Sequence, residues 1–275
     1  MDRWLINGVA SDSLPVADRG LSYGDGLFET IAVRAGQCRF LAAHFDRLAE
    51  GCDRLGIPAP DRQQITDELD QLVAGTEHAS AKIIITRGTG PRGYQPPKLC
   101  QPTRILGLQT TSPVPDATCG VRVRYCETSI SRNPALAGIK TLNRLEQVLA
   151  RAEWDDAGIA EGLMLNDRRE VVCGTMSNLF FTHAGILFTP DLSESGVSGI
   201  MRKMTLQVAQ SHGVEVRELT VSKADLETAD DIFLSNALIG VWPVIELHGQ
   251  KYQRSDVTKQ IMQGLFDMGV IECGI

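Results

Sequence analysis

A stretch that contains two prolines and shows no periodicity, residues 111–118 (TSPVPDAT), divides the sequence into two parts with different patterns. Prolines among turn-forming residues interrupt both helices and strands, so this stretch is predicted to link two domains. A chain of 275 residues is long enough for two compact units. We therefore predict a small N-terminal domain over residues 1–110, a linker over residues 111–118 and a larger domain over residues 119–275.

The part before the linker has the pattern of a small α/β domain. Apolar residues recur at helical spacing over residues 41–55, and Asp61 is placed to cap a second helix that ends near residue 73. Runs of apolar and β-branched residues predict strands at residues 3–6, 28–33, 82–88 and 104–110.

The part after the linker contains many short strand signals and three helical patterns. The helices are expected at residues 142–157, 200–211 and 257–267. The strands are expected at residues 121–126, 162–165, 170–173, 178–182, 186–189, 215–220 and 231–234. Because strands and helices do not alternate as regular repeats, we predict an α+β fold with a barrel-like larger domain, rather than a doubly wound sheet.

The composition argues against several classes of protein. A net charge of -7 disfavours a nucleic acid partner, which requires a basic surface. Long apolar runs such as residues 237–245 contain glycine and proline and are too short to span a membrane. Seven cysteines without a C-x-x-C pair, and five histidines without an H-E-x-x-H pattern, predict no metal site. The first residues show no signal-peptide pattern, so a cytosolic location is expected.

Residues 88–93 (GTGPRG) match the glycine pattern of a dinucleotide-binding loop. That loop must open a helix, but three prolines follow within nine residues, so we reject the nucleotide interpretation. Arg87 and Arg92 lie on this glycine-rich loop, where guanidinium groups are suited to a substrate carboxylate. Two solvated arginines on a turn are an equally good interpretation.

Lys140 follows five small or apolar residues in the sequence PALAGIKTLNR. An ammonium group in an apolar pocket loses hydration, so its pKa falls and the free amine becomes available. A free amine is a base and a nucleophile for aldehydes, including pyridoxal phosphate. This hypothesis requires a phosphate site elsewhere in the chain.

Several segments offer groups for such a site, although each has a simpler explanation. Residues 195–204 (SGVSGIMRKM) place the amides of Gly199, Ile200 and Met201 at the start of a predicted helix, where an anion is favoured. An ordinary capped helix would have the same pattern. Arg47 lies on the flank of its helix and is either a phosphate ligand or solvated. The polar residues of SNLFF (177–181) and SNAL (235–238) line a pocket or form turns.

Taken in order, these residues resemble the fold-type IV family of pyridoxal-phosphate enzymes, which includes branched-chain and D-amino-acid aminotransferases and deoxychorismate lyases. The likeness covers nearly the whole chain. It is carried by DRGLSYGDGLFETI (18–31), HFDRL (44–48), KTLNRLEQVLARAEW (140–154), SNLFF, SGIMR (198–202) and SNAL. Within the family, RGTGPRGY (87–94) and RNPALAGIKTLNRLEQ (132–147) are most similar to the lyases.

The resemblance implies a role for each candidate residue. Lys140 would form the Schiff base with pyridoxal phosphate, Arg47 and the amides of Ile200 and Met201 would bind its phosphate, and Phe28 and Thr30 would point into the substrate pocket. The candidates for cofactor contact are Lys140, Arg47, Cys173, Asn178, Gly199, Ile200, Met201, Ser235 and Asn236. Arg87 and Arg92 remain candidates for a substrate carboxylate. The family also implies a homodimer with its active site between the domains.

One position departs from the family pattern. Five residues before Asn178 the family has a glutamate that pairs with the pyridine nitrogen, whereas this chain has Cys173. A thiol is a weak hydrogen-bonding group without charge, so the cofactor ring would be a poorer electron sink. Glu170 takes the role instead if the strand register differs.

The implied activity is conversion of 4-amino-4-deoxychorismate to 4-aminobenzoate and pyruvate, a step in folate synthesis. Elimination that makes an aromatic ring needs the electron sink less than transamination does, so Cys173 favours the lyase. The alternatives are an aminotransferase of branched-chain or D-amino acids and a catalytically silent relative of the same fold.

Overall fold

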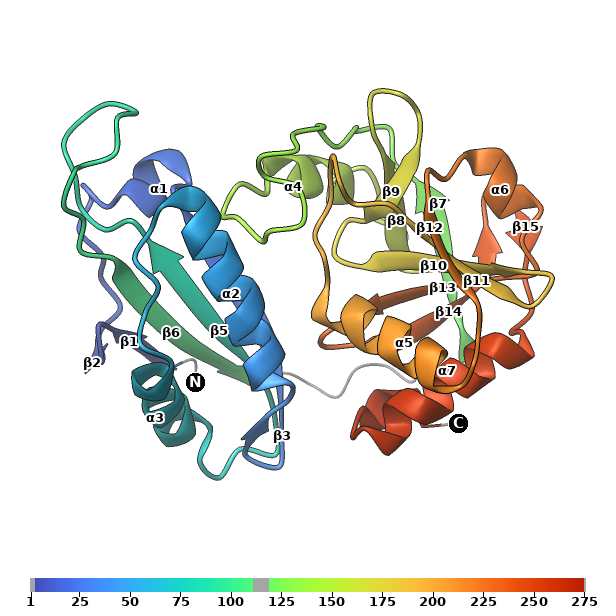
Figure 1. Ribbon diagram of the computed structural model, residues 1–275, viewed down its shortest axis with the longest axis horizontal. Helices are drawn as coiled ribbons and strands as arrows, with labels where there is room; N and C mark the ends of the chain where they lie inside the picture. Colours follow the sequence, from blue (N-terminus) through green and yellow to red (C-terminus); the bar gives the residue numbers. More distant parts are fainter. Residues whose placement is uncertain (1–2, 111–118, 275) are drawn as a thin grey trace. The chain divides into compact units, whose positions relative to one another are not determined.

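The computed structural model describes residues 3–110 and 119–274, and the chain forms two compact units (Figure 1). The small unit contains the described residues up to 110 together with Ile139–Asn143. The large unit contains residues 119–138 and 144–274. The predicted linker, residues 111–118, lies outside the described residues. Assigning residues 139–143 to the large domain, as the sequence suggested, misses their packing in the small unit.

The small unit is built on a six-stranded antiparallel sheet with the order β2-β1-β6-β5-β3-β4. Its strands are β1 (Arg3–Ile6), β2 (Val9–Ala10), β3 (Gly26–Arg34), β4 (Gln37–Cys38), β5 (His78–Thr86) and β6 (Thr103–Thr110). The helices are α1 (Arg19–Tyr23), α2 (Leu41–Leu55) and α3 (Arg62–Val73). The strands and helices expected from the sequence correspond to β1, β3, β5, β6, α2 and α3, although β5 begins and ends earlier than expected. The short elements α1, β2 and β4 were not predicted.

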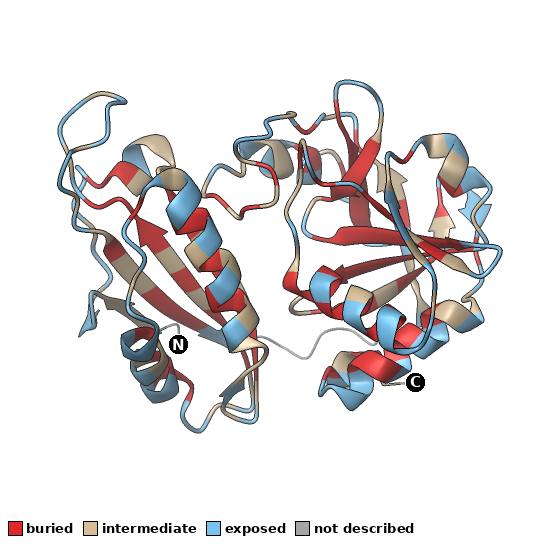
Figure 2. Cartoon of the chain, viewed as in Figure 1, coloured by how far each residue is buried: buried red, intermediate tan, exposed pale blue. Residues whose placement is uncertain are grey.

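One face of this sheet is buried and the other is only partly covered. Alternate residues of β3, such as Leu27 and Ile31, are fully buried and lie on the same side as Ile83 and Ile85 of β5. Figure 2 shows the matching pattern on α2, with buried residues along one side and exposed residues along the other. The opposite sheet face, which includes Phe28, is half-exposed.

The large unit contains a nine-stranded mixed sheet with the order β12-β11-β10-β13-β14-β7-β8-β9, and β15 pairs with β14. Its strands are β7 (Val121–Tyr125), β8 (Ile159–Leu165), β9 (Val171–Gly174), β10 (Asn178–His183), β11 (Ile186–Pro190), β12 (Val216–Leu219), β13 (Asp231–Asn236), β14 (Gly240–Leu247) and β15 (Gln250–Lys251). Its helices are α4 (Leu145–Arg151), α5 (Ile200–Ser211), α6 (Lys223–Glu227), α7 (Asp256–Asp267) and the 3-10 helix η2 (Ile271–Cys273). Among the described strands of this unit, the pairs β11–β12, β14–β7 and β7–β8 are parallel and the others are antiparallel.

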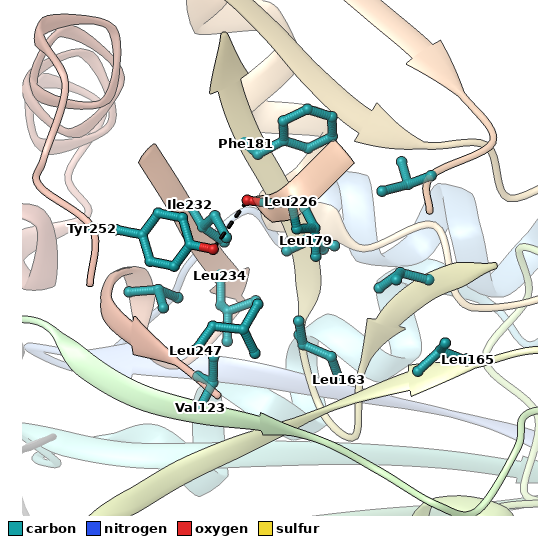
Figure 3. Packing of buried hydrophobic residues seen from close by; sticks show 13 residues of the cluster. Val123, Leu163, Leu165, Leu179, Phe181, Leu226, Ile232, Leu234, Leu247 and Tyr252 are labelled. Atoms are coloured by element: carbon teal, nitrogen blue, oxygen red, sulfur yellow. Dashed lines mark hydrogen bonds between the residues drawn. The ribbon is translucent and has the colours of Figure 1, made fainter. Parts of the chain in front are cut away.

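The core of the large unit lies inside this sheet, where side chains from distant strands meet (Figure 3). Val123, Leu163, Leu179 and Leu234 belong to one buried cluster. Tyr252 is buried at its edge, and its hydroxyl donates to the carbonyl of Leu226 at 3.0 Å. Strands that curl around such a cluster produce the barrel-like character expected from the sequence.

Several elements of the large unit differ from the sequence expectation, and the short elements α6, β15 and η2 were not predicted. Helix α4 is shorter than the predicted 142–157, because Leu142 donates its amide to Gly26 O at 3.0 Å and therefore belongs to a strand edge. Strand β14 was not predicted, because Gly240 and Pro243 are unusual inside a strand. Pro243 nevertheless pairs with Phe233 of β13.

The described part of the chain offers no metal cluster and no membrane span. None of the helices in residues 3–110 and 119–274 combines the length and apolar character needed to cross a bilayer. Within the same ranges, no group of three or more His, Cys, Asp or Glu side chains is arranged to hold a metal ion.

Candidate active site

Lys140 is held at an edge of the small-unit sheet, beside the first residues of β3. Phe28 donates its amide to Lys140 O at 2.9 Å, and Leu27 and Thr141 form an antiparallel bridge. Because side chains alternate across a sheet, Thr141 points to the buried face with Leu27, and Lys140 shares the half-exposed face with Phe28. The Lys140 Nζ lies 4.4 Å from the centroid of the Phe28 ring.

Thr30, the second substrate-pocket candidate on β3, lies two residues from Phe28 and therefore on the same face. Its partner across the β3–β5 pair is Lys82. The structure thus brings together Lys140, Phe28 and Thr30, as the sequence suggested, and adds Lys82. No motif pointed to Lys82, because a lysine inside an apolar strand becomes informative only when its register is known.

On the opposite side of β3, Glu29 is the centre of a buried charged cluster with two residues of α2. Its carboxylate accepts a hydrogen bond from His44 Nδ1 at 2.6 Å and from Arg47 Nε at 2.8 Å, and Arg47 Nη2 completes a bidentate pair. Burial acts to raise the pKa of Glu29, but the hydrogen bonds from His44 and Arg47 outweigh it and hold this pKa below its usual value. Burial lowers the pKa of His44, which therefore binds Glu29 as a neutral ring.

This cluster fixes the guanidinium of Arg47, the predicted phosphate ligand. The Arg47 side chain is 10% exposed and Glu29 is 1% exposed. A bidentate contact sets the plane of an arginine, so Arg47 is oriented before any ligand binds. Glu29 and His44 were not predicted as functional residues. In the sequence, Glu29 is recognisable only as an acid within an otherwise apolar strand, and His44 only as a histidine three residues before Arg47.

The two arginines proposed for a substrate carboxylate have very different environments. Arg87 is buried, and each of its guanidinium nitrogens has an acceptor: Asp25 at 2.8 Å, Gly56 O at 2.8 Å and Leu55 O at 2.7 Å. Arg92 is exposed on the loop. The substrate role of both arginines stays a prediction, and the contacts of Arg87 give it a structural role at the end of α2.

Replacing Arg87 with methionine is expected to lower the free energy of unfolding by about 2–4 kcal/mol, because partly buried Asp25 loses one of its two arginine partners and two helix-end carbonyls lose a donor. The same replacement at Arg92 should change stability by less than about 0.5 kcal/mol, since the side chain is exposed. Urea unfolding of both variants tests this prediction. Equal stability of the two variants would contradict the structural role of Arg87.

In the large unit, the first turn of α5 has the features of an anion site. Gly199 precedes the helix, no side chain caps it, and Ile200 and Met201 form its first turn. Free amides at a helix N-terminus attract negative charge. A Cβ atom on Gly199 would lie 2.0 Å from Asn178 Oδ1, so only glycine fits this close approach.

The strand pair β10–β13 places further predicted residues near this helix. Asn178 pairs with Ser235, and its side-chain amide donates to Val197 O at 2.8 Å, just before Gly199. Ser235 is fully buried, and its hydroxyl has no hydrogen-bond partner among the described residues. Asn236 caps the turn after β13, where its Oδ1 accepts from two backbone amides. The Ser235 hydroxyl is therefore available to hydrogen-bond a ligand atom or a water molecule.

The loop between β9 and β10 is organised by Glu161, which the sequence analysis did not single out. Its buried carboxylate accepts hydrogen bonds from Gly162 N, from Thr175 N and Oγ1, from Met176 N and from Ser177 Oγ, at 2.5–3.1 Å. This many donors fix the loop that precedes Asn178. The only sequence signal was an acid at the start of the apolar run GLML.

Cys173 lies in β9 within an apolar cluster that includes Cys126, Trp154 and Met164. Burial raises the pKa of the Cys173 thiol to about 12, and the charge of Glu161 adds to the shift. The thiol is therefore neutral at physiological pH. Glu170, the alternative partner for a cofactor ring, precedes β9 at the hairpin turn and accepts from Asn166 Nδ2 at 2.6 Å.

The small unit holds a lysine beside an aromatic ring, and the large unit holds a helix N-terminus without a side-chain cap. Each feature is found in enzymes that use a lysine and a phosphorylated cofactor. The family model for amino-transferase class IV matches residues 26–247, so the chain belongs to this family.

Individual relatives and solved structures agree with this assignment. The chain is 46% identical to the 4-amino-4-deoxychorismate lyase structure from Pseudomonas aeruginosa, which covers 97% of this chain and 98% of that one with a TM-score of 0.92. It is 38% identical to the aminodeoxychorismate lyase of Vibrio harveyi over 249 residues, 87% of this chain and 89% of the relative. The branched-chain aminotransferase structure from Escherichia coli has a TM-score of 0.88 at 23% identity over 98% of this chain and 95% of that one. These similarities confirm the predicted two-domain fold of the fold-type IV enzymes.

Proposed function

We propose that this chain is a pyridoxal-phosphate-dependent lyase that converts 4-amino-4-deoxychorismate to 4-aminobenzoate and pyruvate, a reaction of folate synthesis. The observation that carries this proposal is the placement of Lys140 at the edge of β3 beside Phe28, in a chain whose similarity to two such lyases extends over most of its length.

The residues of the large unit fit the phosphate of this cofactor. Gly199 leaves room that a Cβ atom would fill, α5 begins without a side-chain cap, and the Ser235 hydroxyl lacks a partner among the described residues. In our proposal the amides of Ile200 and Met201, together with Ser235, bind the phosphate. Arg47 of the small unit is proposed as a further phosphate ligand on the basis of the family resemblance. When bound, pyridoxal phosphate withdraws electrons from the carbon that carries the substrate amine.

The chemical work assigned to the chain is proton transfer by Lys140. Its free amine removes the proton from the ring carbon that bears the nitrogen. The resulting ammonium then protonates the enolpyruvyl oxygen as its bond to the neighbouring ring carbon breaks, so one group serves as base and then as acid. The electron pair from the broken C–H bond completes the aromatic ring, and the enol of pyruvate leaves. Thr30 and Phe28 orient the substrate ring on the same sheet face.

Purified protein mixed with 4-amino-4-deoxychorismate tests the proposal. We expect 4-aminobenzoate and pyruvate in equal amounts without any added keto acid. Turnover that requires a keto acid would support an aminotransferase instead. A colourless protein to which borohydride attaches no cofactor would support the catalytically silent alternative.

Cys173 distinguishes the lyase from an aminotransferase. Replacing it with glutamate is expected to increase transamination of D-alanine or a branched-chain amino acid by about 10-fold or more, because a carboxylate would favour a protonated cofactor ring. Cys173→Ser is the matched control, since it keeps a small polar group without charge. Both half-reactions and thermal stability should be measured, because glutamate would enter an apolar cluster close to Glu161. Equal transamination by both variants would contradict this role for Cys173.

We also propose that the enzyme is a homodimer. Helix α4 exposes Leu145, Val148 and Leu149 by 77%, 60% and 61%, and this spacing puts them on one helix face. An apolar stripe of this kind is a common feature of subunit interfaces. Sedimentation equilibrium measures the oligomeric state directly. The cytosolic location expected from the sequence stays a prediction.

A further inference from the structure

Lys82 shares the half-exposed face of the small-unit sheet with the proposed catalytic lysine. It pairs with Thr30 across β3 and β5, while Phe28 pairs with Ile84, so Lys82 and Phe28 are diagonal neighbours. The Lys82 Nζ lies 5.2 Å from the centroid of the Phe28 ring, and the Lys140 Nζ lies 4.4 Å from the same centroid. The two nitrogens are therefore less than about 10 Å apart.

The carboxylates of the small unit that form ion pairs engage other residues. Glu29 lies on the opposite face with Arg47, Asp25 pairs with Arg87, and Glu68 pairs with Arg104. Among residues 3–110 and 119–274, no carboxylate oxygen lies within the 4.0 Å ion-pair distance of Lys82 Nζ. A half-buried ammonium next to an aromatic ring has lost part of its hydration, so an incoming anion would be stabilised there.

The proposed substrate has a carboxylate suited to this position. Its amine, which reacts near Lys140, and its ring carboxylate are attached at opposite ends of a six-membered ring, roughly 6 Å apart from ordinary bond lengths. A six-membered ring that packs against Phe28 would place one end near each lysine. We infer that Lys82 binds the ring carboxylate of the substrate and so determines which amines Lys140 can act on, an inference that rests on the proposed lyase function.

The charge of Lys82 is compatible with the chemistry proposed for Lys140. An adjacent positive charge favours the free amine of Lys140, which is the form that removes a proton from carbon. A substrate carboxylate bound to Lys82 would pair with its ammonium group and fix the ring. The second substrate carboxylate, on the enolpyruvyl group, leaves with pyruvate and is the competing assignment.

The test compares Lys82→Met, which removes the charge at similar volume, with Lys82→Arg, which keeps it, and with Lys251→Met at an exposed position in β15. For Lys82→Met we expect KM for 4-amino-4-deoxychorismate to rise roughly 10- to 100-fold, with kcat within about threefold. The inhibition constant of 4-aminobenzoate should rise by a similar factor, and that of pyruvate should not change. Lys82→Arg should recover most of the affinity, and Lys251→Met should match the wild type.

Other outcomes would overturn the inference. An unchanged KM excludes a carboxylate contact, and a selective loss of pyruvate inhibition assigns Lys82 to the enolpyruvyl carboxylate. If the wild type shows no lyase turnover, the proposed function fails separately. In that case, calorimetry of 4-aminobenzoate binding to the cofactor-loaded protein still tests whether Lys82 binds a carboxylate. The carboxylate site is excluded if the wild type does not bind 4-aminobenzoate. It is also excluded if the wild type and Lys82→Met have equal Kd values.

Discussion

Replacement of Lys140 with arginine is expected to lower kcat for 4-aminobenzoate formation by about 10³-fold or more, because arginine stays protonated and cannot act as a base or a nucleophile. Arginine keeps the positive charge beside Phe28, so the loss would reflect chemistry rather than a missing cation. The rate of 4-aminobenzoate formation is measured in discontinuous assays, and the visible absorbance of the bound cofactor shows whether the variant still binds it.

The control for this prediction is Lys251→Arg, at an exposed position in the large unit, which should keep wild-type activity. Borohydride treatment followed by peptide mass analysis should find the cofactor on the Lys140 peptide of the wild type and nowhere in Lys140→Arg. Activity of Lys140→Arg within tenfold of the wild type, or cofactor trapped on another lysine, would contradict the assignment.

Replacement of Glu29 with glutamine is expected to have the largest effect on both stability and cofactor affinity. Glu29 is 1% exposed and binds Arg47 and His44, so its neutralisation removes the carboxylate that pairs with a largely buried guanidinium. Breaking a buried ion pair on one side costs about 3–5 kcal/mol of the free energy of unfolding. Because Arg47 also loses its fixed orientation, the Kd for pyridoxal phosphate should rise about 10-fold or more.

Glu68→Gln provides the matched control in the same unit. Glu68 forms a comparable bidentate pair with Arg104, at 2.5 and 2.9 Å, and both side chains are largely buried. This variant should lose stability but keep the cofactor affinity of the wild type. Urea unfolding and a fluorescence titration with pyridoxal phosphate separate the two effects. Equal loss of affinity in both variants would show that Glu29 acts only through general stability.

The sequence predicted the regular elements well because their patterns are local. The apolar spacing of α2 and the alternation in β3 can be read within a few residues. The sequence failed where a distant contact decides the conformation. Residues 141 and 142 continue a helical pattern, yet they pair with the start of β3, and strand β14 contains a proline that its neighbours accommodate.

The sequence predicted those candidate site residues that lie in recognisable short motifs. Lys140, Arg47 and Gly199 were found from short sequence patterns and from the family resemblance. Glu29, Glu161 and Lys82 were not found, because each is a single charged residue in an apolar strand. The role of such a residue can be assigned only when the residues that it contacts are known, and these lie in other helices, strands and loops.

By itself, the sequence determined the two-part organisation and the family, and it predicted Lys140 as the reactive lysine. These properties depend on residue type, local periodicity and short motifs, which do not require knowledge of distant contacts. The tertiary structure alone decided that Lys140 belongs to the small unit, that Arg87 is used to hold the end of α2, and that Lys82 faces Phe28. Each of these facts depends on strand register and on hydrogen bonds between residues far apart in the chain, which local sequence patterns do not specify.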